Sequence, residues 1–123
     1  MTRPARLVAV AGSAGLLAFQ AGLAAGAPWG AFAWGGQHER DLPRHLRAAS
    51  AASTFVYAGS VAAAASRTES AGLIRVRTAY TILYAVGTVV NAASRSARER
   101  LLWTPVAGAL AVSFWRLRRE PVL

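Results

Sequence analysis

The sequence predicts an all-α fold, a membrane-embedded antiparallel four-helix bundle. Four stretches contain no charged residue, at about residues 7–26, 48–66, 78–94 and 101–115. The longer ones match the roughly 18–20 residues that a helix needs to cross the hydrocarbon core of a bilayer. The connectors between them are rich in arginine, as loops beside membrane spans commonly are. The connectors are too short to hold a second module, so residues 1–123 are expected to form one domain.

Composition narrows the class of protein. A soluble bundle would need polar side chains at every third or fourth position of each helix, but the first stretch offers only Ser13 and Gln20. All 14 basic residues are arginine, and they flank the apolar stretches, which favours contact with lipid phosphates over nucleic-acid binding. The absence of cysteine excludes disulfides, thiolate catalysis and cysteine-ligated metals. We therefore expect the lipid bilayer as a partner, and neither nucleic acid nor a cofactor.

The first stretch, 7–26, is expected to be a transmembrane helix. Arg3 and Arg6 precede it and residues 25–27 resemble a signal-peptide cleavage site. The stretch is longer than the roughly 7–15 residues of a signal peptide's apolar core, and Pro28 would follow the cut, so we expect no cleavage. Small residues recur at intervals of four, which predicts packing against a neighbouring helix of the same chain, with homodimerisation as the alternative. They are Ala14, Ala18, Gly22 and Gly26.

An irregular loop is predicted over residues 27–46, because Gly35, Gly36 and Pro43 break any helix there. The second and third stretches then carry polar residues at helical spacing, which places each set on one face. Those faces are expected to point inward, since hydroxyl and amide groups are costly against lipid tails. The sets are Ser50, Ser53, Tyr57 and Ser60, and Tyr80, Tyr84, Gly87 and Asn91, and Gln20 is able to join them. They predict either a polar cavity or hydrogen bonds that hold the helices together.

The fourth stretch, 101–115, is the shortest, and Pro105 is expected in its first turn, where a missing amide hydrogen costs little. With four spans, both termini lie on the same side as the connector 67–77. The positive-inside rule then favours cytoplasmic termini, because that side carries more arginines than the other. The first side has Arg3, Arg6, Arg67, Arg75, Arg77, Arg116, Arg118 and Arg119, and the other has Arg40, Arg44, Arg47, Arg95, Arg98 and Arg100.

No Asp, Glu or His falls inside any of the four stretches. Proton-coupled transporters commonly carry such a group within a span, and many ion channels carry a charged ring at mid-membrane. Both classes are therefore disfavoured.

The up-and-down topology gathers the chemistry of the chain at one membrane face, around residues 27–46 and 91–105. The candidate ligand-binding residues are Trp29, Trp34, Arg47, Tyr84, Asn91, Ser94, Arg95, Glu99 and Trp103. Glu99 with His38 or His45 is the candidate pair for general acid–base catalysis. A metal site built from His38, Asp41 and His45, with Glu39 or Glu99 nearby, is not expected, because Pro43 interrupts the set and its spacing matches no ligand motif. The arginines of this face, Arg44, Arg47, Arg95, Arg98 and Arg100, would either clamp an anionic group or anchor helix ends.

Two blocks at this face resemble a group of short, uncharacterised bacterial four-helix integral membrane proteins. The first block is Ala27-Pro28-Trp29-Gly30, Trp34-Gly35-Gly36 and Leu42-Pro43, and the second runs from Asn91 to Pro105 with Ser94, Ser96, Glu99, Arg100, Trp103 and Thr104. The resemblance covers nearly the whole chain. It implies the four-helix fold and a multi-pass location in the bacterial inner membrane, but no activity.

These observations predict a small polytopic membrane protein, more readily a binding protein than an enzyme. It is expected to bind a lipid or small amphipathic ligand, or a partner membrane protein, where loop 27–46 meets residues 91–105. A small intramembrane enzyme that uses Glu99 and a loop histidine is one alternative. An oligomeric pore or carrier is the other, because a single bundle of this size leaves little room for a path.

Overall fold

The computed structural model describes residues 3–68 and 70–118, and this part of the chain is all-helical, as predicted. The four long helices are α1 (Arg3–Ala25), α2 (Arg44–Ala65), α3 (Ala71–Ala92) and α4 (Ala97–Arg118). Two short 3₁₀ turns, η1 (Gly30–Phe32) and η2 (Trp34–Gly36), lie in the loop between α1 and α2. Arg119, assigned above to the side of the termini, lies outside the described residues.

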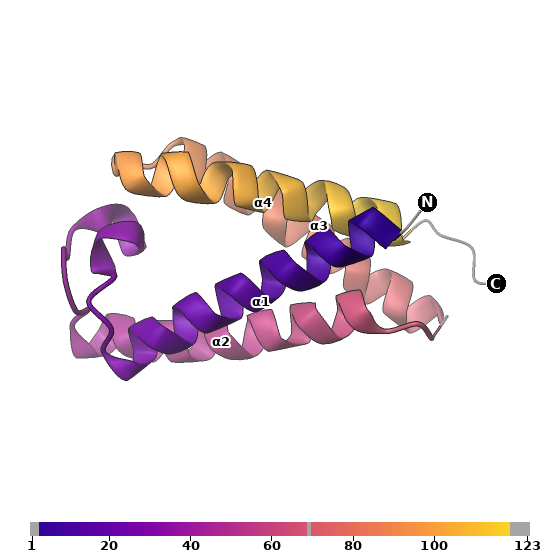
Figure 1. Ribbon diagram of the computed structural model, residues 1–123, viewed down its shortest axis with the longest axis horizontal. Helices are drawn as coiled ribbons and strands as arrows, with labels where there is room; N and C mark the ends of the chain where they lie inside the picture. Colours follow the sequence, from indigo (N-terminus) through magenta and orange to yellow (C-terminus); the bar gives the residue numbers. More distant parts are fainter. Residues whose placement is uncertain (1–2, 69, 119–123) are drawn as a thin grey trace.

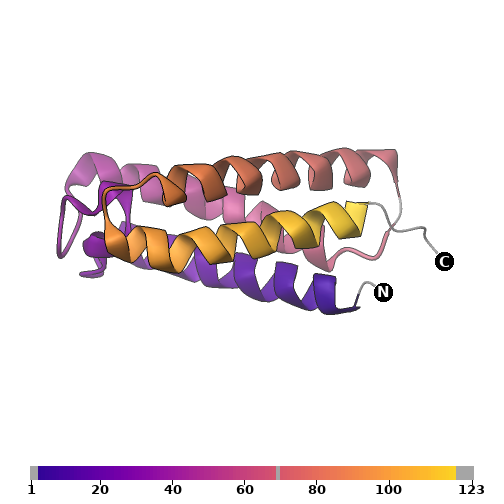
Figure 2. The ribbon, with the colours of Figure 1, turned by 90° about the horizontal axis from the view of Figure 1, so that it is seen from above.

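The four helices form two pairs that converge at one end of the molecule. The start of α1, the connector between α2 and α3 and the end of α4 lie together at what we call the terminal end (Figures 1 and 2). The loop between α1 and α2 and the connector between α3 and α4 lie at the opposite, loop end. Helix α1 packs along α2, and α3 along α4. Figure 1 shows the two pairs close together at the terminal end and separating toward the loop end.

All four helices begin earlier than predicted. Helix α1 starts at Arg3 rather than at residue 7, and α2 starts at Arg44 rather than at residue 48, inside the predicted loop 27–46. Serine caps precede the other two helices. The Ser70 hydroxyl accepts a hydrogen bond from the Leu73 amide (3.0 Å), so α3 starts at Ala71 rather than at residue 78. The Ser96 hydroxyl likewise accepts from the Glu99 amide (3.3 Å), so α4 starts at Ala97 rather than at residue 101. The placement of Pro105 in the first turn of the last helix was therefore wrong, since Pro105 lies inside α4.

The outer surface of the helices is strongly apolar. Helices α1, α2 and α3 are each long and apolar enough to cross a membrane, by length and composition. Large apolar side chains on all four helices are exposed, including Leu7, Phe55, Val89 and Leu101, the last of which is 78% exposed. The charged residues of α4 lie toward its two ends, at Arg98–Arg100 and at Arg116 and Arg118. An uncharged belt thus surrounds the middle of the molecule.

The small residues of α1 do not pack as predicted. Ala14 and Ala18 are exposed, and Gly22 lies beneath the indole ring of Trp29 rather than against another helix. The face that packs on α2 and α4 instead carries the buried residues Ala5, Ala9, Ser13, Leu16 and Leu23. Small residues recur at intervals of four on both faces of this alanine-rich helix, so the spacing alone does not identify the packed face. The packed face is the one that carries the Ser13 hydroxyl, which bonds to a neighbouring helix.

A chain of buried hydroxyl groups joins three helices near the middle of the molecule. Ser13 of α1 and Ser60 of α2 are hydrogen-bonded at 2.6 Å, and Ser60 and Tyr84 of α3 at 2.7 Å. The two serines are fully buried and Tyr84 is only 3% exposed. The predicted inward orientation of the polar faces is confirmed for Ser60 and Tyr84, and for Ser50, which is also buried.

Ser60→Ala is expected to lower the free energy of unfolding by about 1–3 kcal/mol, because it removes two interhelical bonds that each contribute roughly 0.6–1.7 kcal/mol in membrane proteins. Equilibrium unfolding by SDS in mixed micelles, followed by circular dichroism, measures this change. Ser53→Ala is the matched control, because the Ser53 hydroxyl donates only to the Ala49 carbonyl of its own helix (2.9 Å). Equal effects of the two substitutions would contradict a structural role for the hydroxyl chain.

Two arginines at the terminal end donate hydrogen bonds to backbone carbonyl groups. Arg6 donates to the carbonyl oxygens of Ala64 and Ser66, both at 2.8 Å. Arg77, which is 8% exposed, donates to Ala63 (3.0 Å) and Ser66 (2.7 Å) at the end of α2 and to Leu117 (3.3 Å) in the last turn of α4. These carbonyls lack partners within their helices, and a cation there also interacts favourably with the helix dipoles. The terminal end is therefore held together by arginine, in addition to any anchoring role.

Candidate ligand-binding site

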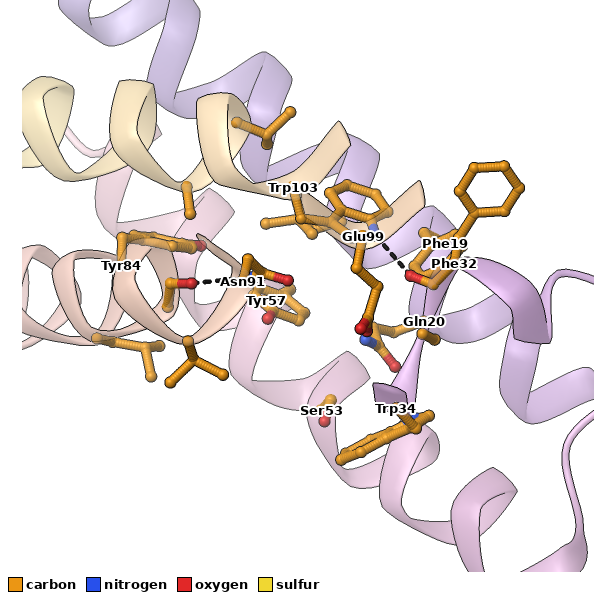
Figure 3. Close-up of a pocket in the computed structure, with 17 residues that line it drawn as sticks. Phe19, Gln20, Phe32, Trp34, Ser53, Tyr57, Tyr84, Asn91, Glu99 and Trp103 are labelled. Atoms are coloured by element: carbon orange, nitrogen blue, oxygen red, sulfur yellow. Dashed lines mark hydrogen bonds between the residues drawn. The ribbon is translucent and has the colours of Figure 1, made fainter. Parts of the chain in front are cut away.

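A cavity of about 270 Å³ lies between the two helix pairs, toward the loop end (Figure 3). All four helices and the loop contribute side chains to it. The labelled residues in Figure 3 that line it are Phe19, Gln20, Phe32, Trp34, Ser53, Tyr57, Tyr84, Asn91, Glu99 and Trp103. Its volume is slightly below the range typical of small-molecule sites, about 300–1,000 Å³, so only a small molecule would fit.

The cavity forms because α2 and α3 are joined only over part of their length. The hydrogen bonds between them that the described residues make involve residues 56–66 and 77–84, among them the bond from the Tyr80 hydroxyl to the Val56 carbonyl (2.6 Å). Nearer the loop end, α3 presents Gly87 to the cavity, where a β-carbon would meet only Ala107, at 3.9 Å. The missing side chain and the separation of the pairs together leave the space open.

Three aromatic side chains form the wall on the side of α1 and α4. The Trp103 indole N–H donates to the Phe32 carbonyl (2.7 Å), as Figure 3 shows, and the rings of Phe19 and Trp103 are 4.7 Å apart. The same three residues also line an apolar groove on the outer surface, together with Trp29. They therefore separate the cavity from that groove.

The loop closes the cavity through a tight turn at Trp34, Gly35 and Gly36. All three residues have positive φ (50°, 81° and 70°), a conformation that favours glycine, which explains the glycine pair. The Trp34 indole N–H donates to the hydroxyl of buried Ser50 on α2 (3.0 Å). The turn aims the Gly35 amide at Glu99 of α4, so the loop bridges the two helix pairs.

Glu99 is a buried carboxylate at the edge of the cavity. It is 7% exposed and accepts hydrogen bonds from the Gly35 amide (3.2 Å) and the Ser94 hydroxyl (2.5 Å). Two nearby arginines have other partners, because Arg100 donates to the Ser94 carbonyl (2.9 Å) and Arg98 lies 5.9 Å from the centre of the Phe32 ring. Glu99 also lines an adjoining, more open hollow of about 420 Å³. Its carboxylate thus faces two connected spaces with neutral donors as its protein partners.

The structure brings most of the predicted ligand-binding residues to this end, but not to one space. Trp34, Tyr84, Asn91, Glu99 and Trp103 line the cavity, and Ser94 and Arg95 line the adjoining hollow with Glu99. Trp29 lies in the outer groove, stacked on Phe19 at 6.0 Å. Arg47 lies elsewhere, where it donates to the Ala24 carbonyl (3.1 Å) and lines a hollow with Arg44.

The two histidines lie apart from the cavity. His38 is half-buried in the loop and His45 is exposed in the first turn of α2, and neither lines the cavity. Within residues 3–68 and 70–118, no three His, Asp or Glu side chains come close enough together to hold a metal ion.

Sequence reasoning missed several residues of the cavity. Phe19 and Leu16 lie on the same face of α1 as Ser13 and Gln20, so the helical spacing of that face would have found them. Phe32 carried no such signal, because its position depends on how the loop folds over α4.

Comparison of the chain with protein-family models, with curated proteins and with solved structures finds no match. The resemblance to short bacterial four-helix membrane proteins therefore stays a prediction.

Proposed function

We propose that this chain is an integral membrane protein, an antiparallel bundle of four transmembrane helices, that binds a small amphipathic molecule in the cavity between its two helix pairs. The bacterial inner membrane with both termini in the cytoplasm is the proposed location, and a reporter fused to the C-terminus would test this orientation.

The apolar surface supports the membrane part of this proposal. Large apolar side chains such as Phe55, Leu101 and Val89 are exposed on different helices, as expected of helix faces that contact lipid tails. Three helices meet the length and composition of a span. Helix α4 would cross through its uncharged segment, 101–115, with the arginines at its ends reaching the headgroups.

The lining of the cavity carries the binding part of the proposal. Aromatic rings from α1, the loop, α2, α3 and α4 surround it, while Gln20, Asn91 and Glu99 supply a few polar groups. Apolar walls with few convergent polar groups are typical of small-molecule sites. The acid–base alternative has less support, because Glu99 is bonded to Gly35 and Ser94 and neither His38 nor His45 lines the cavity.

Gly87→Leu is expected to abolish retention of the small molecule while the protein stays folded. A β-carbon at this position meets only Ala107 at ordinary contact distance, so the leucine side chain extends into the cavity. Replacing glycine inside a helix also gains about 0.8–1 kcal/mol in helix propensity, which opposes any loss from crowding. Native mass spectrometry of protein extracted in mild detergent would measure the bound mass.

Gly15→Leu is the matched control, with the same chemical change on the outer face of α1, where a β-carbon meets nothing within 4 Å. We expect Gly15→Leu to retain the bound molecule. Because Gly15 lines the outer groove, loss of the bound molecule in Gly15→Leu alone would indicate that the molecule binds in the groove and not in the cavity. Wild-type protein that carries no small molecule, or two variants that retain it equally, would contradict the proposal.

A further inference from the structure

Most hydrogen-bond donors of the cavity are already used within the protein. The indole N–H groups of Trp34 and Trp103 donate to Ser50 and to the Phe32 carbonyl. The Asn91 amide donates to the Gly87 carbonyl (2.7 Å), and the Ser53 hydroxyl to the Ala49 carbonyl. Among the described lining residues, the Gln20 side-chain amide nitrogen and the Tyr57 hydroxyl keep their donors, so a ligand in this space meets ring faces and few free donors.

The acceptors of the cavity, by contrast, have capacity left. The side-chain oxygen of Gln20 is buried and has no hydrogen-bond partner within the described residues. Because the Asn91 nitrogen bonds to Gly87, its side-chain oxygen is left as an acceptor. Each carboxylate oxygen of Glu99 accepts one bond from the protein and can accept another. Figure 3 shows Glu99 and Gln20 projecting toward each other from α4 and α1.

The lining of the cavity is negatively charged, which favours the same kind of ligand as its excess of hydrogen-bond acceptors. Glu99 is the only charged side chain among the described residues that line it. The aromatic rings add negative faces, which attract cations, and such attraction is strongest where water is excluded.

From this accounting we infer that the occupant carries a positively charged, hydrogen-bond-donating group, such as a protonated primary amine, on an apolar body. The inference rests on the proposed function and names the chemical class of its ligand. The cationic group lies between Glu99, Gln20 and Asn91, and the apolar body lies among the aromatic rings. An anionic head would meet Glu99 without a compensating arginine in the cavity, and a carbonyl head would find few donors.

The test uses the full chain in nanodiscs of zwitterionic lipid and three probes of equal length, ω-bromooctylamine, ω-bromooctanol and ω-bromooctanoate. Bromine quenches tryptophan on contact, so Trp29→Phe and Trp115→Phe are introduced to leave only Trp34 and Trp103, both in the cavity wall, as emitters. We expect saturable quenching by the amine at concentrations about 10- to 100-fold below those needed for the alcohol. A charge-assisted hydrogen bond increases affinity by about this factor. The carboxylate is expected to bind most weakly.

Glu99→Gln is expected to bring the affinity for the amine down to that for the alcohol. Because Glu99 also joins the loop to α4, Gln20→Leu is the second variant, and it removes an acceptor with no partner in the described protein. We expect Gln20→Leu to leave the folded state at least as stable and to weaken amine binding about 3- to 10-fold. Arg75→Gln is the control, because Arg75 is exposed and lies in the first turns of α3, at the terminal end, and it should not weaken amine binding.

The outcomes separate this inference from the proposed function. Saturable binding of the alcohol or the carboxylate as tight as that of the amine, abolished by Gly87→Leu, would overturn the inference and leave the proposed function standing. Insensitivity of amine binding to Glu99→Gln and to Gln20→Leu would also overturn it. No saturable quenching by any probe, and no difference after Gly87→Leu, would overturn both.

Discussion

Replacing Arg77 by leucine is expected to lower the free energy of unfolding by about 3–5 kcal/mol, the largest effect of any single substitution considered. The guanidinium group donates to three carbonyl oxygens, on Ala63, Ser66 and Leu117, that lack partners in their own helices. A hydrogen bond from a charged donor contributes roughly 1.5–3 kcal/mol, and the substitution removes it from the carbonyls of the buried residues Ala63 and Leu117. The Ser66 carbonyl keeps its bond from Arg6, which is why the expected loss is less than three full bonds.

Arg75→Leu provides the matched control, because Arg75 is exposed and lies two residues away on the same helix. Its unfolding free energy should stay within about 0.5 kcal/mol of the wild type. The free energy of unfolding of Arg77→Lys should lie between those of the two leucine variants. A single ammonium group cannot bond to the carbonyls of α2 and α4 together as well as the planar guanidinium group of arginine does. SDS unfolding in mixed micelles, followed by circular dichroism, measures all three. If Arg77→Leu unfolds like Arg75→Leu, the contacts of Arg77 do not hold the terminal end together.

The number and order of the helices were predictable because apolar stretches and arginine-rich connectors repeat along the whole chain. Their ends were not, because charge was taken to mark the limits of a helix. Helix α3 continues through Arg75 and Arg77 since Ser70 caps it, and α4 includes Glu99 since Ser96 caps it. Serine followed three residues later by Glu, as in Ser96–Glu99, is a recognised capping signal, so this start could have been found in the sequence.

The candidate site was predictable in part, for a related reason. Helical spacing places Tyr84 and Asn91 on one face of α3, and topology brings that face to the loop end. The spacing could not tell which face of α1 packs inward, because alanine and glycine occur on both. It also could not place Phe32 or the Gly35 amide, because those positions depend on loop contacts with residues far along the chain, at Trp103 and Glu99.

Gly30→Ala is expected to displace the loop and to remove the ligand site while the four helices persist. Gly30 is buried, and its amide donates to the Arg40 carbonyl (2.7 Å). A β-carbon there would overlap the His38 carbonyl oxygen and lie 2.5 Å from that of Arg40, so the backbone itself must move. Crowding of this kind costs about 1–3 kcal/mol and the lost bond roughly 1 kcal/mol more, which gives about 2–4 kcal/mol in all.

Displacement of the loop is expected to weaken ligand binding, because the loop carries part of the cavity wall. Phe32 and Trp34 line the cavity, and the Gly35 amide holds Glu99, so displacement of the loop opens the cavity and frees the carboxylate. Amine binding, measured by the quenching of tryptophan, should weaken more than about 10-fold, which corresponds to about 1.4 kcal/mol. Gly72→Ala is the control, since a β-carbon there meets only the Ser70 hydroxyl at 3.8 Å. If Gly30→Ala binds and unfolds like Gly72→Ala, the closed loop is not what makes the site.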